Sequence, residues 1–316
     1  MIARTILRLG LRFLLSLLLA SAVIFLLLRA IPGDPARVAL GVTATDEAVA
    51  RLAEQLGTDR PLAVQYLDWV GGLLTGDFGV SLSSRQDITA LVLDRAQVSL
   101  ILCGVAMVLS LAVAVPMGMW AARRSERADG IVISGFSQVG IAVPSFLAGI
   151  LLVTVFAVHL GWVPANGWIP PGEDTGGFLA RLILPVIALT LVQAAILTRY
   201  VRSSILEVMD QDFIRTARST GASTSEALWR HGLRNAALPV LTVTGLQLTS
   251  LVVGAVVIER VFMLPGLGSM LLDSVARRDL TTVQTIVMLL VVFTLTVNLL
   301  VDLTYRIVDP RIRRSA

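Results

Sequence analysis

The chain contains no lysine, because all 26 of its basic residues are arginine. A phosphate-binding P-loop needs a lysine that reaches the terminal phosphates of the nucleotide. This chain therefore cannot supply such a loop. If ATP drives its activity, another polypeptide must hydrolyse the ATP.

Cysteine and histidine are also scarce: Cys103 is the only cysteine, and the sequence has two histidines. One cysteine cannot form an intrachain disulfide, and within an apolar run it acts as a small hydrophobic residue. Two histidines far apart in sequence do not provide the clustered ligands of a metal site. We therefore expect no cofactor and no metal on this chain.

Charge is low and apolar content is high, at 15% charged and 55% hydrophobic residues with a mean hydropathy of +0.81. A soluble domain is about 25% charged and about 45–50% apolar, so much of this surface must face lipid. Six apolar runs are long enough to cross a bilayer as helices. They are Phe13–Ile31, Val98–Trp120, Ile131–Leu160, Phe178–Val201, Val240–Phe262 and Thr282–Ile307. The sequence predicts an all-α integral membrane protein, a single transmembrane domain over residues 1–316 with six spans.

Two runs need comment. Ala20-Ser21-Ala22 is similar to a signal-peptide cleavage site, but the apolar run continues past it, which favours an uncleaved first span. Pro144 and Ser145 lie near the middle of the third run and predict a kink or tilt there.

The arginines predict the orientation. Most of them lie in the N-terminus, residues 121–130, residues 199–239 and the C-terminal tail, which six spans place on one side. Arginine beside spans marks the cytoplasmic side, so both termini are predicted to be cytoplasmic, and no nucleic-acid partner is expected despite the pI of about 10.1. Residues 32–97, the polar segment, are then extracytoplasmic. They are acidic, with short helices predicted at Asp46–Leu56 and Ala63–Leu74.

Residues 202–239 are too long for a simple turn. Helical spacing predicts one helix over Ile205–Thr220, which Gly221 would end. Ser223-Thr224-Ser225-Glu226 then predicts a capping box, followed by a second helix that ends before Pro239. We expect four apolar side chains to be exposed together: Phe213, Ile214, Leu228 and Trp229. An apolar patch rimmed with arginine favours a docking surface over a solvated hairpin.

Residues 202–239 also carry a resemblance, and are named the coupling loop after it. Residues Asp212, Phe213, Ile214, Arg215, Thr216, Ala217, Arg218, Gly221 and Ala222 are similar to the coupling loop of binding-protein-dependent ABC importer permeases. Arg215-Thr216-Ala217 takes the place of the family's Glu-Ala-Ala triplet, without its glutamate. That departure, together with Arg230–Pro239, Gly76–Ser81, Leu264–Gly268 and Asp309-Pro310-Arg311, resembles the dipeptide/oligopeptide/nickel branch.

The resemblance implies an ABC importer permease fold in the cytoplasmic membrane of a prokaryote. It further implies a paralogous permease, two ATPase subunits that bind ATP and Mg, and an extracytoplasmic solute-binding protein that docks on the polar segment. The chain itself would have no catalytic residue, and the loop residues above would couple it to the ATPases. Peptides are the expected cargo, with nickel or another small chelate as the alternative.

Uncharged polar residues lie within the predicted spans, among them Gln193, Gln247 and Asn298. They either line a solute path or form hydrogen bonds between helices. Glu259 and Arg260 are expected at the outer interface. Two further alternatives are a self-contained secondary transporter or channel and an assembly scaffold without a transport path. No charge is predicted deep in a span, which argues against a proton-coupled transporter.

Overall fold

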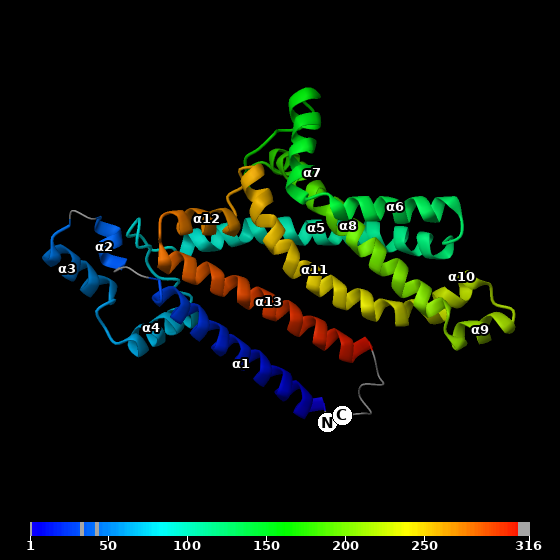
Figure 1. The fold of residues 1–316 in the computed structure, drawn as a ribbon, viewed down its shortest axis with the longest axis horizontal. Helices are drawn as coiled ribbons and strands as arrows, with labels where there is room; N and C mark the ends of the chain where they lie inside the picture. The colour runs from blue at the N-terminus through cyan, green and yellow to red at the C-terminus, as the bar shows by residue number, and fades with distance from the viewer. Residues whose placement is uncertain (1, 32–34, 42–43, 309–316) are drawn as a thin grey trace. The chain divides into compact units, whose positions relative to one another are not determined.

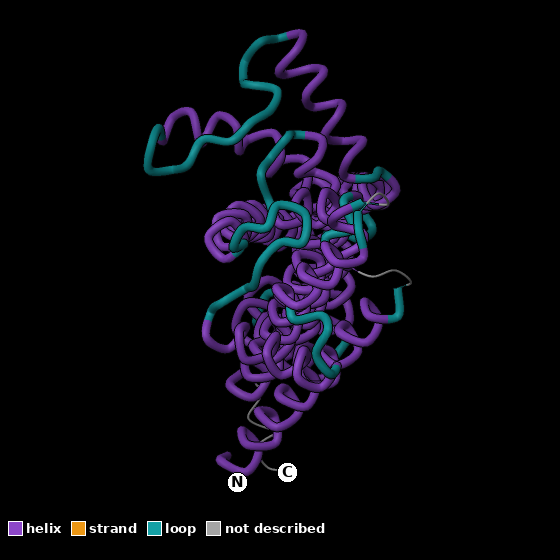
Figure 2. Tube along the Cα trace, turned by 90° about the vertical axis from the view of Figure 1, so that its left-hand side faces the viewer, coloured by secondary structure: helices purple, strands orange, loops and turns teal. Residues whose placement is uncertain are grey.

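The computed structural model describes residues 2–31, 35–41 and 44–308 (Figure 1). Within these residues the regular structure is helical (Figure 2). An isolated antiparallel bridge joins Val80 and Asp87. The predicted motif Asp309-Pro310-Arg311 lies outside the described residues. The helices are α1 (Ile2–Arg29), α2 (Pro35–Leu40), α3 (Asp46–Leu56), α4 (Leu62–Thr75), α5 (Thr89–Arg123), α6 (Ala128–Ala142), α7 (Ser145–Leu152), α8 (Thr175–Met209), α9 (Asp212–Ser219), α10 (Thr224–Ala227), α11 (Leu233–Val261), α12 (Leu267–Ala276) and α13 (Leu280–Val308), with π-helical segments η1 (Val153–His159) and η2 (Leu228–Gly232).

Five helices of the described chain are long and apolar enough to cross a membrane. They cover Leu7–Arg29, Thr89–Arg123, Thr175–Met209, Leu233–Val261 and Leu280–Tyr305. The prediction of an all-α membrane protein is therefore confirmed, and each of these helices contains one of the predicted apolar runs or most of it.

The third predicted span is not a kinked single helix. It forms α6 and then α7 with η1, and the two parts are bent by 97°. Two consecutive residues cause the break: Val143 (φ −88°, ψ 120°) and Pro144 (φ −62°, ψ 140°) both have extended backbone. The ring of a proline disfavours helical backbone at the residue before it, so the chain turns sharply here. Counting this pair as one span gives six.

The chain divides into two compact units. The first comprises residues 1–98 and 266–299, and the second comprises residues 99–265 and 300–316. In the second unit α8 packs against α6, α7 and α11. A missing side chain permits the close approach of α6, because a Cβ at Gly140 would lie 2.7 Å from Ala195 of α8. Gly118 does the same for α5, since a Cβ there would lie 2.6 Å from Val201 of α8.

In the first unit the predicted short helices are confirmed, α3 with the predicted bounds and α4 one residue longer at each end. Local signals define α3: Thr45 Oγ1 accepts a hydrogen bond from Ala48 N at 3.3 Å, and Gly57 ends the helix at φ +66°. After α4 the chain forms a turn that Asp279, directly before α13, holds in place. Its buried carboxylate accepts hydrogen bonds from Ser81 Oγ, Leu82 N (3.0 Å) and Thr282 Oγ1 (2.9 Å).

Candidate functional site

The coupling loop begins differently from its prediction. One helix over Ile205–Thr220 is wrong, because Ile205–Met209 forms the end of α8 and a new helix, α9, starts at Asp212. Gln211 separates the two with extended backbone (φ −73°, ψ 147°). A single residue in that conformation redirects the chain, and the helical spacing on its two sides does not reveal it.

Gly221 ends α9, as predicted. Its φ of +99° lies in the region that side chains rarely adopt. Ala222 N donates to Ala217 O at 3.1 Å, and Gly221 N donates to Arg218 O at 3.0 Å. This pair of hydrogen bonds is the Schellman arrangement. A Cβ at Gly221 would meet nothing within 4 Å, so the backbone conformation and not space requires glycine.

Ser223 caps the next helix, as predicted, because its Oγ accepts a hydrogen bond from Glu226 N at 3.2 Å. The Glu226 carboxylate pairs with Arg230 at 3.2 Å. The predicted stop before Pro239 is wrong: α10 and η2 lead into α11, which continues through Pro239 to Val261. Proline removes one backbone hydrogen bond, and membrane helices tolerate it where neighbouring groups satisfy the freed carbonyl.

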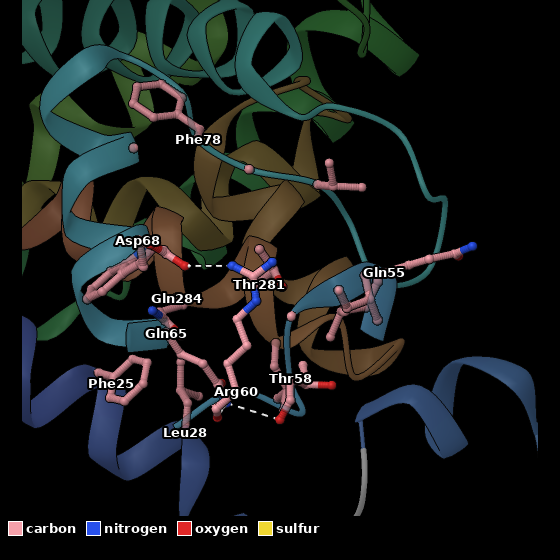
Figure 3. Close-up of a pocket in the computed structure, with 18 of the residues that line it drawn as sticks. Phe25, Leu28, Gln55, Thr58, Arg60, Gln65, Asp68, Phe78, Thr281 and Gln284 are labelled. Atoms are coloured by element: carbon pink, nitrogen blue, oxygen red, sulfur yellow. Dashed lines mark hydrogen bonds and ion pairs between the residues drawn. The ribbon is translucent and has the colours of Figure 1, made fainter. Parts of the chain in front are cut away.

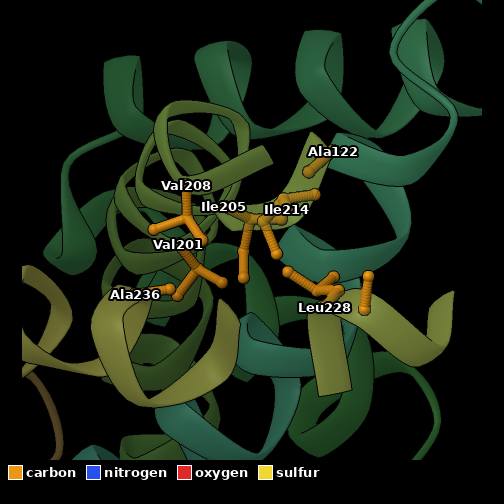
Figure 4. Packing of buried hydrophobic residues seen from close by; sticks show 8 residues of the cluster. Ala122, Val201, Ile205, Val208, Ile214, Leu228 and Ala236 are labelled. Atoms are coloured by element: carbon orange, nitrogen blue, oxygen red, sulfur yellow. The ribbon is translucent and has the colours of Figure 1, made fainter. Parts of the chain in front are cut away.

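The predicted exposed patch is half wrong. Ile214 and Leu228 are each 1% exposed and belong to an apolar core with residues of α8 and α11 (Figure 4). The buried members of this core are Ala122, Val201, Ile205, Val208, Ile214, Ala227, Leu228 and Ala236. A Cβ at Gly232 would lie 2.7 Å from the side chain of Leu228 and 3.1 Å from that of Val208, so the glycine leaves room for both side chains in the core. The core fixes the inner face of α9 to the end of α8 and the start of α11.

The outer face of α9 remains exposed. Phe213 is 39% exposed, and Trp229 of η2 is 59% exposed. The side chain of Arg215 is 69% exposed, and its nearest carboxylate, on Asp212, lies 3.6 Å away on the surface. A solvated pair of that kind adds little stability, so Arg215 stays available to another partner. Arg218, Thr216 and Ser219 are exposed on the same short helix. The arrangement is a stiff helix with aromatic and cationic groups facing outward.

The polar residues predicted within the spans have different surroundings. Gln193 of α8 is 7% exposed, and its Oε1 has no hydrogen-bond partner among the described residues. Gln247 of α11 is half-buried in the same unit, whereas Asn298 of α13 is exposed and belongs to the other unit. Because a buried amide oxygen without a partner costs free energy, Gln193 is the strongest candidate of the three for contact with water or solute.

Glu259 was expected at an interface, but it is 1% exposed. Its carboxylate accepts a hydrogen bond from Ser99 Oγ at 2.6 Å. The predicted location of Glu259 is therefore wrong, and Asp279 was not singled out from the sequence; both are buried acids. The sequence does contain a signal for their burial. Both acids lie directly at the edge of an apolar run, where a charged side chain must either be buried with a partner or reach the interface.

The first unit contains a cavity of about 510 Å³ (Figure 3). Its lining includes an ion pair, in which Arg60 lies 3.2 Å from Asp68. Three buried polar atoms of its lining have no partner among the described residues: Arg29 Nε, Gln65 Oε1 and Trp69 Nε1. Such atoms favour a hydrated cavity. Among the described residues there is no group of three or more histidine, cysteine or acidic residues that could hold a metal ion.

Comparison with known proteins identifies the family of this chain. The family model described as "Binding-protein-dependent transport system inner membrane component" matches residues 114–314, and the model of its N-terminal region matches residues 1–103. A Sinorhizobium fredii protein named as the probable peptide ABC transporter permease protein y4tP is 39% identical over 290 residues, which cover 92% of this chain and 93% of the relative. The oligopeptide transport system permease protein AppB of Bacillus subtilis is 37% identical, with coverage of 91% and 92%. The glutathione transport system permease protein GsiC of Salmonella typhi is 36% identical, with coverage of 94% and 95%.

Two solved structures share the fold. The inward-facing MetNI methionine ABC transporter aligns with a TM-score of 0.58 at 17% identity, covering 70% of this chain and 98% of that one. An amino acid ABC transporter crystallised with histidines aligns with a TM-score of 0.53 at 21% identity, covering 69% and 94%. Identities this low carry the fold alone, which is that of an ABC transporter permease.

Proposed function

Because the chain belongs to the family of binding-protein-dependent transport system inner membrane components, as a permease subunit of an ABC importer, we propose that it imports di- or oligopeptides. The translocation path would form between this chain and a second, paralogous permease. The names of three relatives that match over nearly their whole length, for peptides, oligopeptides and glutathione, support this cargo class. No nickel system is among those three.

The ATP-binding partners follow from what the chain lacks and from what the coupling loop exposes. Without lysine the chain cannot build a P-loop, so ATP and Mg would bind on two partner ATPase subunits. One observation carries the proposal: α9 is fixed to α8 and α11 through Ile214, while Phe213 and Arg215 face outward. A helix fixed on one side and exposed on the other would transmit a movement of the ATPase to the spans.

The orientation completes the proposal. Arginine is concentrated in the N-terminus, residues 121–130 and the coupling loop, which favours placing both termini and α9 in the cytoplasm. The polar segment would then face the solute-binding protein. Gln193 and Gln247 would contact solute in the path, and Asn298 is the third candidate.

Purification tests the proposal directly. The chain is tagged in its own membrane and solubilised in mild detergent, and its stoichiometric partners are identified. We expect a second permease and P-loop ATPases, and ATP-dependent uptake of a labelled peptide, in preference to a nickel chelate, once the complex and its binding protein are reconstituted in vesicles. A chain that purifies alone and still moves solute would contradict the ABC mechanism.

A further inference from the structure

The helix α4 (Leu62–Thr75) has an unusual surface for a segment that was predicted to lie outside the membrane. Asp68 is its single ionisable acid, and it has no basic residue. None of its residues is buried, and three leucines are more than half exposed: Leu62 at 53%, Leu67 at 67% and Leu74 at 84%. Its 14 residues extend over about 21 Å, too short to cross a bilayer.

Contacts with α1 give the depth of α4. Tyr66 Oη lies 2.8 Å from Ser21 Oγ, and the rings of Tyr66 and Trp69 lie 5.4 Å and 6.3 Å from the ring of Phe25. Ser21 precedes Arg29, the end of the candidate span, by eight residues, which corresponds to about 12 Å along the helix. Figure 1 shows α4 beside the last part of α1. Since α1 crosses the membrane, the contact lies within one leaflet and not in the water beyond it.

The surface of α1 next to this contact would face lipid, because only 11% of the apolar window of this candidate span is buried within the chain. It carries exposed apolar side chains around the buried Phe25, namely Leu18, Leu19, Val23, Leu26 and Leu27. The exposed leucines of α4 add further apolar surface to the helix that packs against this part of α1 through Tyr66 and Trp69. Leu67 and Leu74 do not line the hydrated cavity beside this contact, so in a membrane acyl chains or another protein would cover them.

The aromatic and charged groups of α4 fit such a location. Tyr66 and Trp69 are the residue types that gather at membrane interfaces, with an apolar body and a polar tip. Asp68 pairs with Arg60, which precedes the helix. A short, mostly apolar helix with exposed leucines and with Tyr66 and Trp69 on it suits the apolar side of the interface, where aromatic rings gather.

We propose that α4 is an interfacial helix embedded in the leaflet at the C-terminal end of α1, with Leu67 and Leu74 in contact with lipid acyl chains. In the proposed orientation this is the extracytoplasmic leaflet. The solute-binding protein would then meet the remainder of the polar segment and not α4. The inference requires only that α1 crosses the membrane, so it does not depend on the cargo or on ATP coupling.

Site-directed spin labelling tests the proposal. Cys103, which is buried, is first replaced by serine, and single cysteines are then introduced as L67C and L74C in the complex reconstituted in vesicles. Two controls frame the result: L19C on the lipid-facing surface of α1, and A50C on the exposed side of α3. Collision with molecular oxygen reports lipid contact, and collision with a water-soluble nickel chelate, present on both sides, reports water.

We expect the ratio of the oxygen collision rate to the chelate collision rate at positions 67 and 74 to be close to that of L19C and well above that of A50C. A ratio equal to that of A50C would overturn the proposal, because the leucines would face water. Low collision rates with both reagents would also overturn it, because a protein partner would then cover α4. Two independent positions keep the test valid if one variant does not assemble.

Discussion

The coupling loop and the polar segment both connect spans, but different interactions fix them. The coupling loop is fixed by apolar packing, with Ile214 and Leu228 buried against α8 and α11. The turn in the polar segment is fixed by hydrogen bonds, with Ser81 and Leu82 donating to the buried carboxylate of Asp279. Hydrophobic packing has no preferred direction, whereas hydrogen bonds hold one geometry. The coupling loop is therefore suited to follow a movement of α8 and α11. The turn at Ser81 and Leu82 is suited to hold a fixed position relative to the start of α13.

Gly221→Pro is expected to have the largest effect on the coupling loop. Proline requires φ near −65°, whereas Gly221 adopts φ +99° and donates its N–H to Arg218 O. The chain should still insert and assemble, but ATP hydrolysis should no longer drive uptake. Peptide uptake and ATPase rate in reconstituted vesicles measure the two activities separately.

Gly221→Asn is the matched control, because asparagine tolerates positive φ better than other residues with a side chain. It should keep most of the coupling. Uptake at the level of the unmodified protein in Gly221→Pro would contradict the proposed role of this turn.

Asp279→Ala should have the largest effect on the polar segment. It leaves Ser81 Oγ, Leu82 N and Thr282 Oγ1 buried without their acceptor. Two of these hydrogen bonds, from Ser81 and Leu82, hold the turn itself. Hydrogen bonds to a charged group contribute about 1.5–3 kcal/mol each, so opening of this turn should become easier by about 3–6 kcal/mol. Amide hydrogen exchange at Leu82 measures it. Asp77→Ala, which removes one exposed acceptor from Gly79 N, should change exchange far less. Equal effects from both variants would refute a special role for Asp279.

Ile214→Ala and Phe213→Ala separate the anchor of α9 from its exposed face. Ile214 is 1% exposed, so its truncation should destabilise the packing of α9 by about 2–4 kcal/mol. Phe213 is 39% exposed, and its truncation should leave α9 in place but weaken binding of the ATPase subunits. Hydrogen exchange in α9 and retention of the ATPases during purification measure the two effects. If Phe213→Ala loosens α9 as much as Ile214→Ala does, the distinction between anchor and face is wrong.

The same contrast explains how far the sequence could predict the structure. The bounds of α3 were predictable because Thr45 and Gly57 are local signals at its two ends. The six apolar runs and the turn at Gly221 are local in the same sense. The burial of Ile214 and Leu228 was not predictable, because it depends on residues of α8 and α11 that helical spacing cannot place beside α9. The depth of α4 likewise depends on the contact between Tyr66 and Ser21, 45 residues apart.

Arg215→Ala and Arg218→Ala should give the smallest effect. Both side chains are exposed on α9, and they line the same polar groove of the coupling loop. If they meet carboxylates on the ATPase, each exposed pair contributes about 0.2–1 kcal/mol and weakens as salt rises. The double variant should therefore bind the ATPases slightly less at low salt and equally at high salt. Arg230→Ala is the control, since Arg230 already pairs with Glu226 within the loop. An affinity of the unmodified complex that does not depend on salt would show that Phe213 and the apolar contacts alone hold the ATPase on α9.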